Sequence, residues 1–205
     1  MVHDDPSPDV LPRLEKAEQL KLDGHHQEAL VILEELLFED PENVAALEEV
    51  ADNELSLEHY PRAETAAKQA LALDPSSYTA EYILGFLRSR KEEWKEAVAH
   101  LRKANLLKSN NPEILRCLGW ALFCSGERAQ GVVTLERSLN LESDSTLTLC
   151  DLGIAYLELR NFAKSRALFL RALDLDPQNQ RARECIKALE RLRSAVATTE
   201  EKSVR

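Results

Sequence analysis

The sequence predicts an all-α protein in which helical hairpins stack side by side into a solenoid. Three observations support this prediction: a pattern recurs every 34 residues, apolar residues within each unit are spaced three and four apart, and the 205 residues include only six glycines. Apolar spacing of three and four is typical of helices that each bury one stripe. Units of this kind bury their faces on their neighbours, so one unit alone is not expected to be stable.

The unit is clearest between residues 146 and 179, which are predicted to form two consecutive helices. The apolar face of the first helix consists of Leu149, Leu152, Gly153, Tyr156 and Leu159. A break at Arg160-Asn161 follows, and the face of the second helix consists of Phe162, Ser165, Phe169, Ala172 and Leu173. The second helix is predicted to end before Pro177, because proline lacks an amide donor and restricts the residue before it.

Small residues recur at fixed positions when the same unit is stepped back along the chain. Position eight holds Ala17, Ala51, Gly85, Gly119 and Gly153; position twenty holds Ala29, Ala63, Ala97, Gly131 and Ser165. A third column, expected to meet the next unit, holds Leu36, Ala70, Ala104, Ser138 and Ala172. The distance between packed helices depends on the side chains at the contact, so small residues here predict tight hairpins.

Five units in register resemble the tetratricopeptide repeat (TPR) family, whose period and small-residue pattern they match. The units span 10–43, 44–77, 78–111, 112–145 and 146–179. The resemblance implies a right-handed α-solenoid of helix-turn-helix repeats. It is weaker at the aromatic positions of the family. The usual tryptophan at position four is absent, and the tyrosine at position eleven survives only as Tyr156.

The two ends of the chain differ from the repeats. Residues 1–9 are acidic and contain two prolines, so they are predicted to be disordered. Residues 180–194 are predicted to form a helix that caps the last repeat, because terminal repeats need a polar outer face. One side of this helix is apolar, with Ala182, Cys185, Ile186, Leu189 and Leu192. Residues 195–205 are predicted to be a disordered polar tail.

Charge is distributed unevenly along the chain. Residues 1–77 contain 19 acidic and 5 basic residues, whereas residues 78–205 contain 17 acidic and 21 basic residues. Nucleic-acid binding requires a basic patch for the phosphates, so an acidic half of this size argues against a nucleic-acid partner. Most of these carboxylates are expected to form a solvated surface, although the asymmetry also permits contact between copies of the chain.

Several other classes of function find no support in the sequence. No apolar run approaches the roughly 20 residues of a membrane span, and the start lacks the pattern of a signal peptide, so a cytoplasmic location without membrane insertion is expected. The four cysteines show no metal-binding or disulfide spacing. His25 and His26 are adjacent in a predicted turn and are not expected to share one ion. We therefore expect no metal and no cofactor.

The TPR resemblance implies where a partner would bind. In that family the first helix of each repeat lines the concave groove, and by helical rotation positions two, five, nine and twelve form the groove-facing stripe. Of the eleven phenylalanine, tyrosine and tryptophan residues of the chain, four fall on this stripe, in adjacent repeats three and four. The candidate partner-binding residues are Tyr82, Phe86, Arg90, Arg116, Trp120, Phe123, Ile154 and Leu157.

The apolar area of these side chains indicates that the aromatic surface is covered by something. Each large aromatic side chain can bury about 150–250 Å², and soluble monomers seldom expose more than a few hundred Å² of contiguous apolar surface. A bound peptide, a second copy of the chain or one of its own tails is therefore expected to cover it. Arg90 and Arg116 would offer a place for a carboxylate. The clamp for acidic chaperone tails found in some TPR proteins is not expected, because Glu18 and Asp52 would repel such a ligand.

The leading functional hypothesis is a non-enzymatic module that binds an apolar or amphipathic segment of a partner protein, as an adaptor, assembly factor or chaperone. The alternative is a self-associating scaffold, and a narrower version of the first hypothesis is an acidic TPR chaperone of secreted proteins. An enzyme is not expected. The chain has no glycine-rich phosphate loop, no nucleophile elbow and no HExxH motif.

Overall fold

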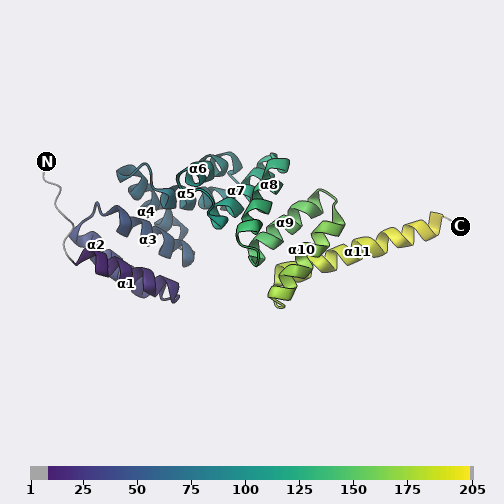
Figure 1. Ribbon diagram of the computed structural model, residues 1–205, viewed down its shortest axis with the longest axis horizontal. Coiled ribbons are helices and arrows are strands. Elements are labelled where there is room, and N and C mark those ends of the chain that lie inside the picture. Colours follow the sequence, from purple (N-terminus) through teal and green to yellow (C-terminus); the bar gives the residue numbers. More distant parts are fainter. Residues whose placement is uncertain (1–8, 204–205) are drawn as a thin grey trace. The chain divides into compact units, whose positions relative to one another are not determined.

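Eleven α-helices make up the part of the chain that the computed structural model describes, residues 9–203, with side chains described up to residue 191 (Figure 1). The first six are α1 (Val10–Leu22), α2 (His26–Glu39), α3 (Val44–Ser56), α4 (Tyr60–Leu73), α5 (Tyr78–Arg90) and α6 (Trp94–Leu107). The other five are α7 (Pro112–Ser125), α8 (Arg128–Leu141), α9 (Thr146–Glu158), α10 (Phe162–Leu175) and α11 (Gln180–Ser203). The predicted all-α solenoid of helical hairpins is confirmed.

Each hairpin begins where its repeat begins, for a local reason. The first helices of the five repeats start at Val10, Val44, Tyr78, Pro112 and Thr146. In repeats two to five the preceding residue is an asparagine or serine whose side chain accepts a hydrogen bond from a backbone amide of the first turn. Such N-caps satisfy an amide that the helix itself leaves without a partner.

The turn inside each hairpin also recurs. Position fifteen of every repeat adopts a positive φ, at Gly24, Glu58, Glu92, Gly126 and Arg160. Glycine adopts this backbone conformation without steric cost, whereas the other three residues adopt it at a cost of roughly 1 kcal/mol each. The same backbone geometry is therefore kept in all five turns, even where the residue does not favour it.

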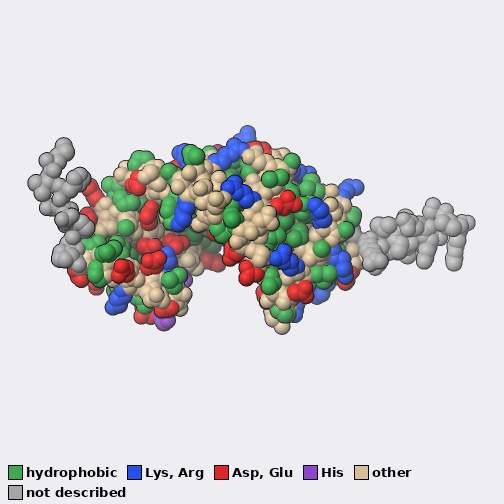
Figure 2. Space-filling model, in the orientation of Figure 1, with side chains coloured by type: hydrophobic (Ala, Val, Ile, Leu, Met, Phe, Trp, Pro, Cys, Tyr) green, Lys and Arg blue, Asp and Glu red, His purple; other side chains and the backbone are tan. Residues whose placement is uncertain are grey.

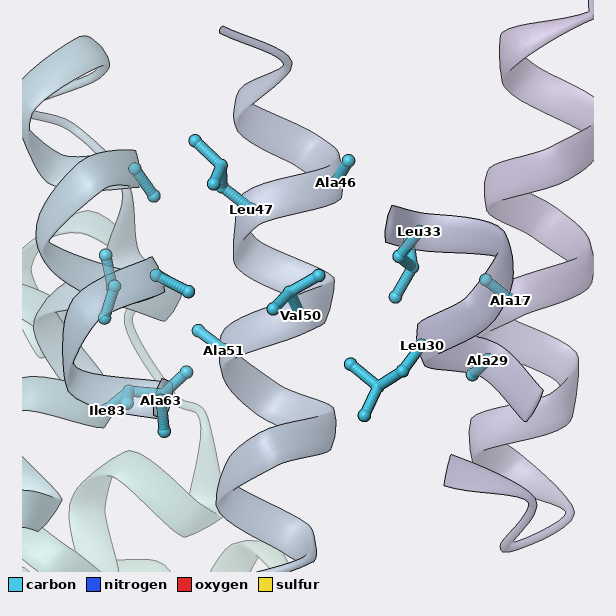
Figure 3. Close-up of a cluster of buried hydrophobic side chains, with 14 of the residues drawn as sticks. Ala17, Ala29, Leu30, Leu33, Ala46, Leu47, Val50, Ala51, Ala63 and Ile83 are labelled. Carbon is cyan, nitrogen blue, oxygen red and sulfur yellow. The ribbon is translucent and has the colours of Figure 1, made fainter. Parts of the chain in front are cut away.

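The contacts divide the chain into two compact units, residues 1–109 and 110–205, which are described separately. In the first unit, Ala17 of α1 and Ala29 of α2 are fully buried where the two helices meet, and Ala51 and Ala63 play the same part between α3 and α4. Figure 3 shows Leu30 and Leu33 of α2 pointing toward α3, which joins the first hairpin to the second.

The second unit has its closest helix contacts in repeat four. A β-carbon added to Gly131 of α8 would lie 2.6 Å from the backbone nitrogen of Phe123 and 2.7 Å from the carbonyl oxygen of Gly119, both in α7. In repeat five, a β-carbon added to Gly153 would lie 2.8 Å from the ring of Phe169, and Ser165 donates a hydrogen bond of 2.8 Å to the Gly153 carbonyl oxygen. The small-residue columns thus set the distance between paired helices.

Helix α11 packs against α9 and α10, where Ala182 and Leu189 are buried. The predicted end of this helix at Ser194 is wrong, because α11 continues to Ser203. No proline or glycine follows residue 180, and alanine, glutamate and lysine in this stretch favour a helix. Of the predicted disordered segment 1–9, all but Asp9 lies outside the described residues, as do residues 204 and 205 of the tail.

Charged groups replace the expected aromatic residue where repeats two and three meet. Position eleven of repeat three is Arg88, which lies 2.9 Å from the Glu64 carboxylate of α4. Glu64 also contacts Lys68 at 2.8 Å and Lys91 at 2.9 Å. The hydrogen bonds from Lys68 and Lys91 lower the pKa of Glu64 to about 2. The charged form of the Glu64 side chain is therefore more stable in the folded chain than in the unfolded chain.

We predict that Gly131→Ala lowers the stability of the protein, although alanine favours a helix over glycine by about 1 kcal/mol. The added methyl group meets backbone atoms of α7 that cannot move aside independently, and overpacking of this kind costs about 1–3 kcal/mol. Thermal unfolding followed by circular dichroism measures the change. Gln130→Ala, at an exposed neighbouring position of α8, is the control, and a higher midpoint for Gly131→Ala would contradict the close approach.

We also predict that the stabilising effect of Glu64 depends on pH. Because its pKa is depressed in the folded state, its contribution is present above the ordinary value of 4.5 and is lost as the pH falls toward about 2. The thermal midpoint of Glu64→Gln should therefore lie below that of the wild type at pH 7, and the gap should close in acid. The exposed Glu42→Gln serves as control. A gap that stays constant with pH would show that the three cations do not act on this carboxylate.

Candidate partner-binding faces

Within each unit, the first helices of successive repeats contact one another directly and so present neighbouring faces. In the first unit α1 contacts α3 and α3 contacts α5, and in the second unit α7 contacts α9 and α9 contacts α11. We define the unit 1 face by half-buried or exposed residues of α1, α3 and α5: Leu14, Glu18, Lys21, Glu48, Glu49, Asp52, Tyr82 and Phe86. We define the unit 2 face by residues of α7, α9 and α11: Glu113, Arg116, Trp120, Ile154, Leu157 and Arg181.

Two aromatic rings of the unit 1 face lie one turn apart on α5. Tyr82 and Phe86 are half-buried, with ring centroids 6.4 Å apart and planes inclined at 44°. Both rings rest on the buried core of the unit. They are therefore held by the core while part of each ring stays accessible. Arg90 is exposed but does not join them, because its guanidinium lies 4.1 Å from the ring centroid of Tyr60 at the start of α4.

Carboxylates dominate the rest of the unit 1 face. Lys21 of α1 is the cation among them, and its ammonium nitrogen lies 2.8 Å from Glu49 and 2.9 Å from Asp52 of α3. Although burial disfavours the charged form, the hydrogen bonds that this ammonium group donates to the two carboxylates raise the pKa of Lys21. Glu48 accepts a hydrogen bond from Ser77, the N-cap of α5. This bond ties the acidic stripe of α3 to the helix that carries the two rings.

The unit 2 face holds Trp120, which is half-buried and stacks on Phe123 with a centroid distance of 6.1 Å and an interplanar angle of 16°. The guanidinium of Arg181, from α11, lies 5.8 Å from the tryptophan ring centroid. Ile154 and Leu157 of α9 are half-buried and pack against the core of the unit. Trp120 and Ile154 therefore remain candidates for contact with a partner.

The expectation that Phe123 lies open on this face is wrong. Only 2% of the residue is exposed, and it packs in a cluster that includes Val132 of α8 and Leu152 of α9. Position twelve lies one turn after position eight and only about 40° around the helix from it. Gly119, at position eight, meets α8 at close range, so Phe123 is drawn into the same contact.

Arg116 is not available as the expected carboxylate-binding group. Its guanidinium lies 2.5 Å from Glu113 in the preceding turn and 2.8 Å from Asp151 of α9. Arg181 contacts the other oxygen of Asp151 at 2.7 Å. The Asp151 side chain is only 4% exposed, so the two arginines enclose it. Burial alone would lower the pKa of Arg116, but the hydrogen bonds and charges of its acidic partners outweigh it and raise the pKa. The ions of the unit 2 face therefore neutralise one another.

Position six lies outside the predicted stripe but contributes a carboxylate to each face. Glu49 and Asp151 both occupy it, and each holds cations from neighbouring helices. Position six lies about 60° around the helix from position nine, so it borders the predicted stripe. A carboxylate at position six of one repeat, with a basic residue at position two, five or twelve of an adjacent repeat, is the signal that would have revealed these networks.

The cysteines do not form a nucleophilic or metal-binding centre in the described residues. Cys117 and Cys150 are buried, and desolvation raises the pKa of both thiols, to about 11 for Cys150. A thiol must lose its proton to act as a nucleophile, so these two are poorly placed for catalysis at neutral pH. Among residues 9–203, no group of three or more His, Cys, Asp or Glu side chains is arranged to hold a metal ion. None of the helices described is long and apolar enough to cross a membrane.

The geometry defines a class of protein, a repeat protein of helical hairpins, and comparison with known families identifies which one. Two tetratricopeptide repeat models match the sequence, one over residues 49–112 and one over residues 147–179. Residues 49–112 and 147–179 are therefore tetratricopeptide repeats, and the five hairpins in series have the fold of that family. Neither model describes a catalytic family. No curated protein matches the sequence at a significant level.

Solved structures show the same fold at low sequence identity. YrrB, described as a TPR protein with an unusual peptide-binding site, is 20% identical, with a TM-score of 0.64 over 86% of this chain and 91% of that chain. TTC0263 of Thermus thermophilus is 23% identical, with a TM-score of 0.66 over 87% and 97%. PilF of Pseudomonas aeruginosa is 18% identical, with a TM-score of 0.72 over 93% and 86%. These likenesses concern the fold.

We predict that Asp151→Asn lowers the free energy of unfolding by about 2 kcal/mol. Removing one partner of a buried ion pair typically costs about 3–5 kcal/mol, but Arg116 keeps Glu113 and the Arg181 side chain is 44% exposed. Urea denaturation measures the change, with the exposed Asp174→Asn as the matched control. Equal stability of the two variants would show that Asp151 does not organise the unit 2 face.

Proposed function

We propose that the protein is a non-enzymatic interaction module whose first-helix faces bind an apolar or amphipathic segment of a partner protein. The fold itself supports the coarser statement that this is a protein–protein interaction module. The observation that supports the finer one is the placement of Tyr82, Phe86 and Trp120. These rings are half-buried on the first helices, and the small-residue contacts that hold the hairpins together do not include them.

The physical reason is that a ring already fixed by the core loses little conformational entropy on binding. Large aromatic residues also supply most of the energy in many protein interfaces, because they remove a large area from water. Within this proposal Ile154 and Leu157 extend the apolar part of the unit 2 face, while Arg90, Arg116 and Phe123 have other partners within the chain. A role as adaptor, assembly factor or chaperone would use the same surfaces.

The four free cysteines are compatible with a reducing compartment, and we propose the cytoplasm as the location. An alternative function is a self-associating scaffold. The uneven charge along the chain favours it, because the acidic repeats of one copy would attract the more basic repeats of another. Light scattering over a dilution series separates the two, since a monomer at high concentration would remove the scaffold function.

We predict that Trp120→Ala combined with Phe86→Ala reduces capture of the partner from a lysate of the source cells at least tenfold. Interface aromatic residues typically contribute 2 kcal/mol or more, and about 1.4 kcal/mol already changes affinity tenfold. Helical content, measured by circular dichroism, should stay unchanged. Phe38→Ala is the matched control, because this ring lies on α2 and is 90% exposed. Loss of capture by the control alone would place the binding surface on the second helices instead.

A further inference from the structure

We propose that the unit 1 face is selective for a basic segment of another protein that carries an apolar anchor between its cations. This inference rests on the proposed function and specifies the ligand chemistry of one of its two faces. The surface combines two features on neighbouring helices, the rings of Tyr82 and Phe86 on α5 and a stripe of carboxylates on α1 and α3. A ligand that satisfies both must place an apolar group beside positive charges.

The charge of the unit 1 face is not compensated within the face. Glu18, Glu48, Glu49 and Asp52 supply four carboxylates, and Lys21 is the basic residue that lies among them. At the end of the molecule that carries α1 to α4, acidic side chains are frequent on the surface shown in Figure 2. Local counter-charge would be concentrated at such a surface, which favours a cationic ligand over an anionic one.

Lys21 shows what kind of group the carboxylates accept. Its ammonium group lies between Glu49 and Asp52, at 2.8 and 2.9 Å, with its side chain only 18% exposed. One lysine already fills this position from within the chain. The exposed Glu18 precedes Lys21 by one turn on α1, and Glu48, which is bonded to Ser77, precedes Glu49 on α3. A partner's lysine or arginine would therefore be received by Glu18 and Glu48, or would share the two carboxylates that Lys21 holds.

The unit 2 face has a different chemistry, so selectivity for a basic segment is expected of the unit 1 face alone. There Glu113 and Asp151 are matched by Arg116 and Arg181, so the ions compensate one another. The half-buried Trp120 lies beneath one of these arginines rather than beside an excess of carboxylates. A basic segment is therefore expected to distinguish the two faces, while a purely apolar segment would not.

The described part of α11 does not fit as the ligand from a second copy of the chain. It is basic, with Arg183, Lys187 and Arg191 exposed, but its apolar residues are directed elsewhere. Ala182 and Leu189 are buried against the last repeat of their own chain, and Cys185 and Ile186 pack on the same cluster. Up to residue 191, where the description of side chains ends, this helix offers cations but no apolar anchor for Tyr82 and Phe86. The occupant that fits is thus a basic amphipathic segment of a different protein.

The test measures binding of synthetic helical peptides to the full-length chain by fluorescence anisotropy. The probe has leucines at every third and fourth position and lysines elsewhere. One reference peptide replaces the lysines with glutamates, and another replaces the leucines with serines. We expect the lysine–leucine peptide to bind at least tenfold more tightly than either reference and to weaken at high salt. Equal binding of the glutamate–leucine peptide would overturn the proposal.

Two sets of substitutions with opposite expected effects, and one control, separate a loss of binding from a loss of folding. Glu18→Gln with Glu48→Gln should weaken the lysine–leucine peptide about tenfold, since each ion pair contributes a modest amount. Glu34→Gln with Glu35→Gln on α2 removes the same charge from another surface and should change little. Lys21→Gln should strengthen binding severalfold, because it frees Glu49 and Asp52. An unaltered affinity in both the Glu18/Glu48 and the Lys21 variants would overturn the proposal.

Failure here is distinguishable from failure of the proposed function. If the lysine–leucine peptide does not bind, while capture of a lysate protein is still lost with Phe86→Ala and Trp120→Ala, the faces bind a partner but the basic ligand class is wrong. If neither binding nor capture depends on these residues, both proposals fail. Self-association that titrates with the Glu18 and Glu48 substitutions would assign the face to a second copy and also overturn the proposal.

Discussion

The close approach of paired helix backbones is the constraint on which the rest of the structure depends. At positions eight and twenty of every repeat a small residue lies between the two helices, and in repeat four both are glycines with no room for a β-carbon. Hairpins of constant thickness can stack in register, because each repeat presents its neighbour with the same surface. Within each unit, that register brings the first helices of successive repeats into contact and makes their outward residues neighbours.

The same constraint separates residues that stabilise the fold from residues that are free to bind. Positions close to the small-residue column are drawn into the hairpin, as Phe123 shows, whereas Tyr82 and Phe86 lie far enough around α5 to keep part of each ring accessible. Ion pairs then distinguish the two units. Arginines balance the acids of the unit 2 face, whereas the unit 1 face retains an excess of carboxylates around Lys21.

The sequence was sufficient to predict the helices and the repeat phase, because caps, small residues and apolar spacing are local and recur five times. It was not sufficient to predict the ion pairs of Arg116, because its contact with Asp151 depends on how adjacent helices are rotated. The burial of Phe123 differs from the prediction because helical rotation alone gives a stripe without a sharp edge. The end of α11 was missed for a different reason, since a polar composition without proline permits either a helix or a tail.

The most direct test of the account is photo-crosslinking from two single positions of the full-length chain. A photoreactive residue in place of Phe86 lies on the unit 1 face, and one in place of Phe38 lies on the outer side of α2. With the lysine–leucine peptide present, the account predicts a crosslinked product from position 86 and none from position 38. A product from position 38 alone would contradict the claim that the first helices carry the binding surface.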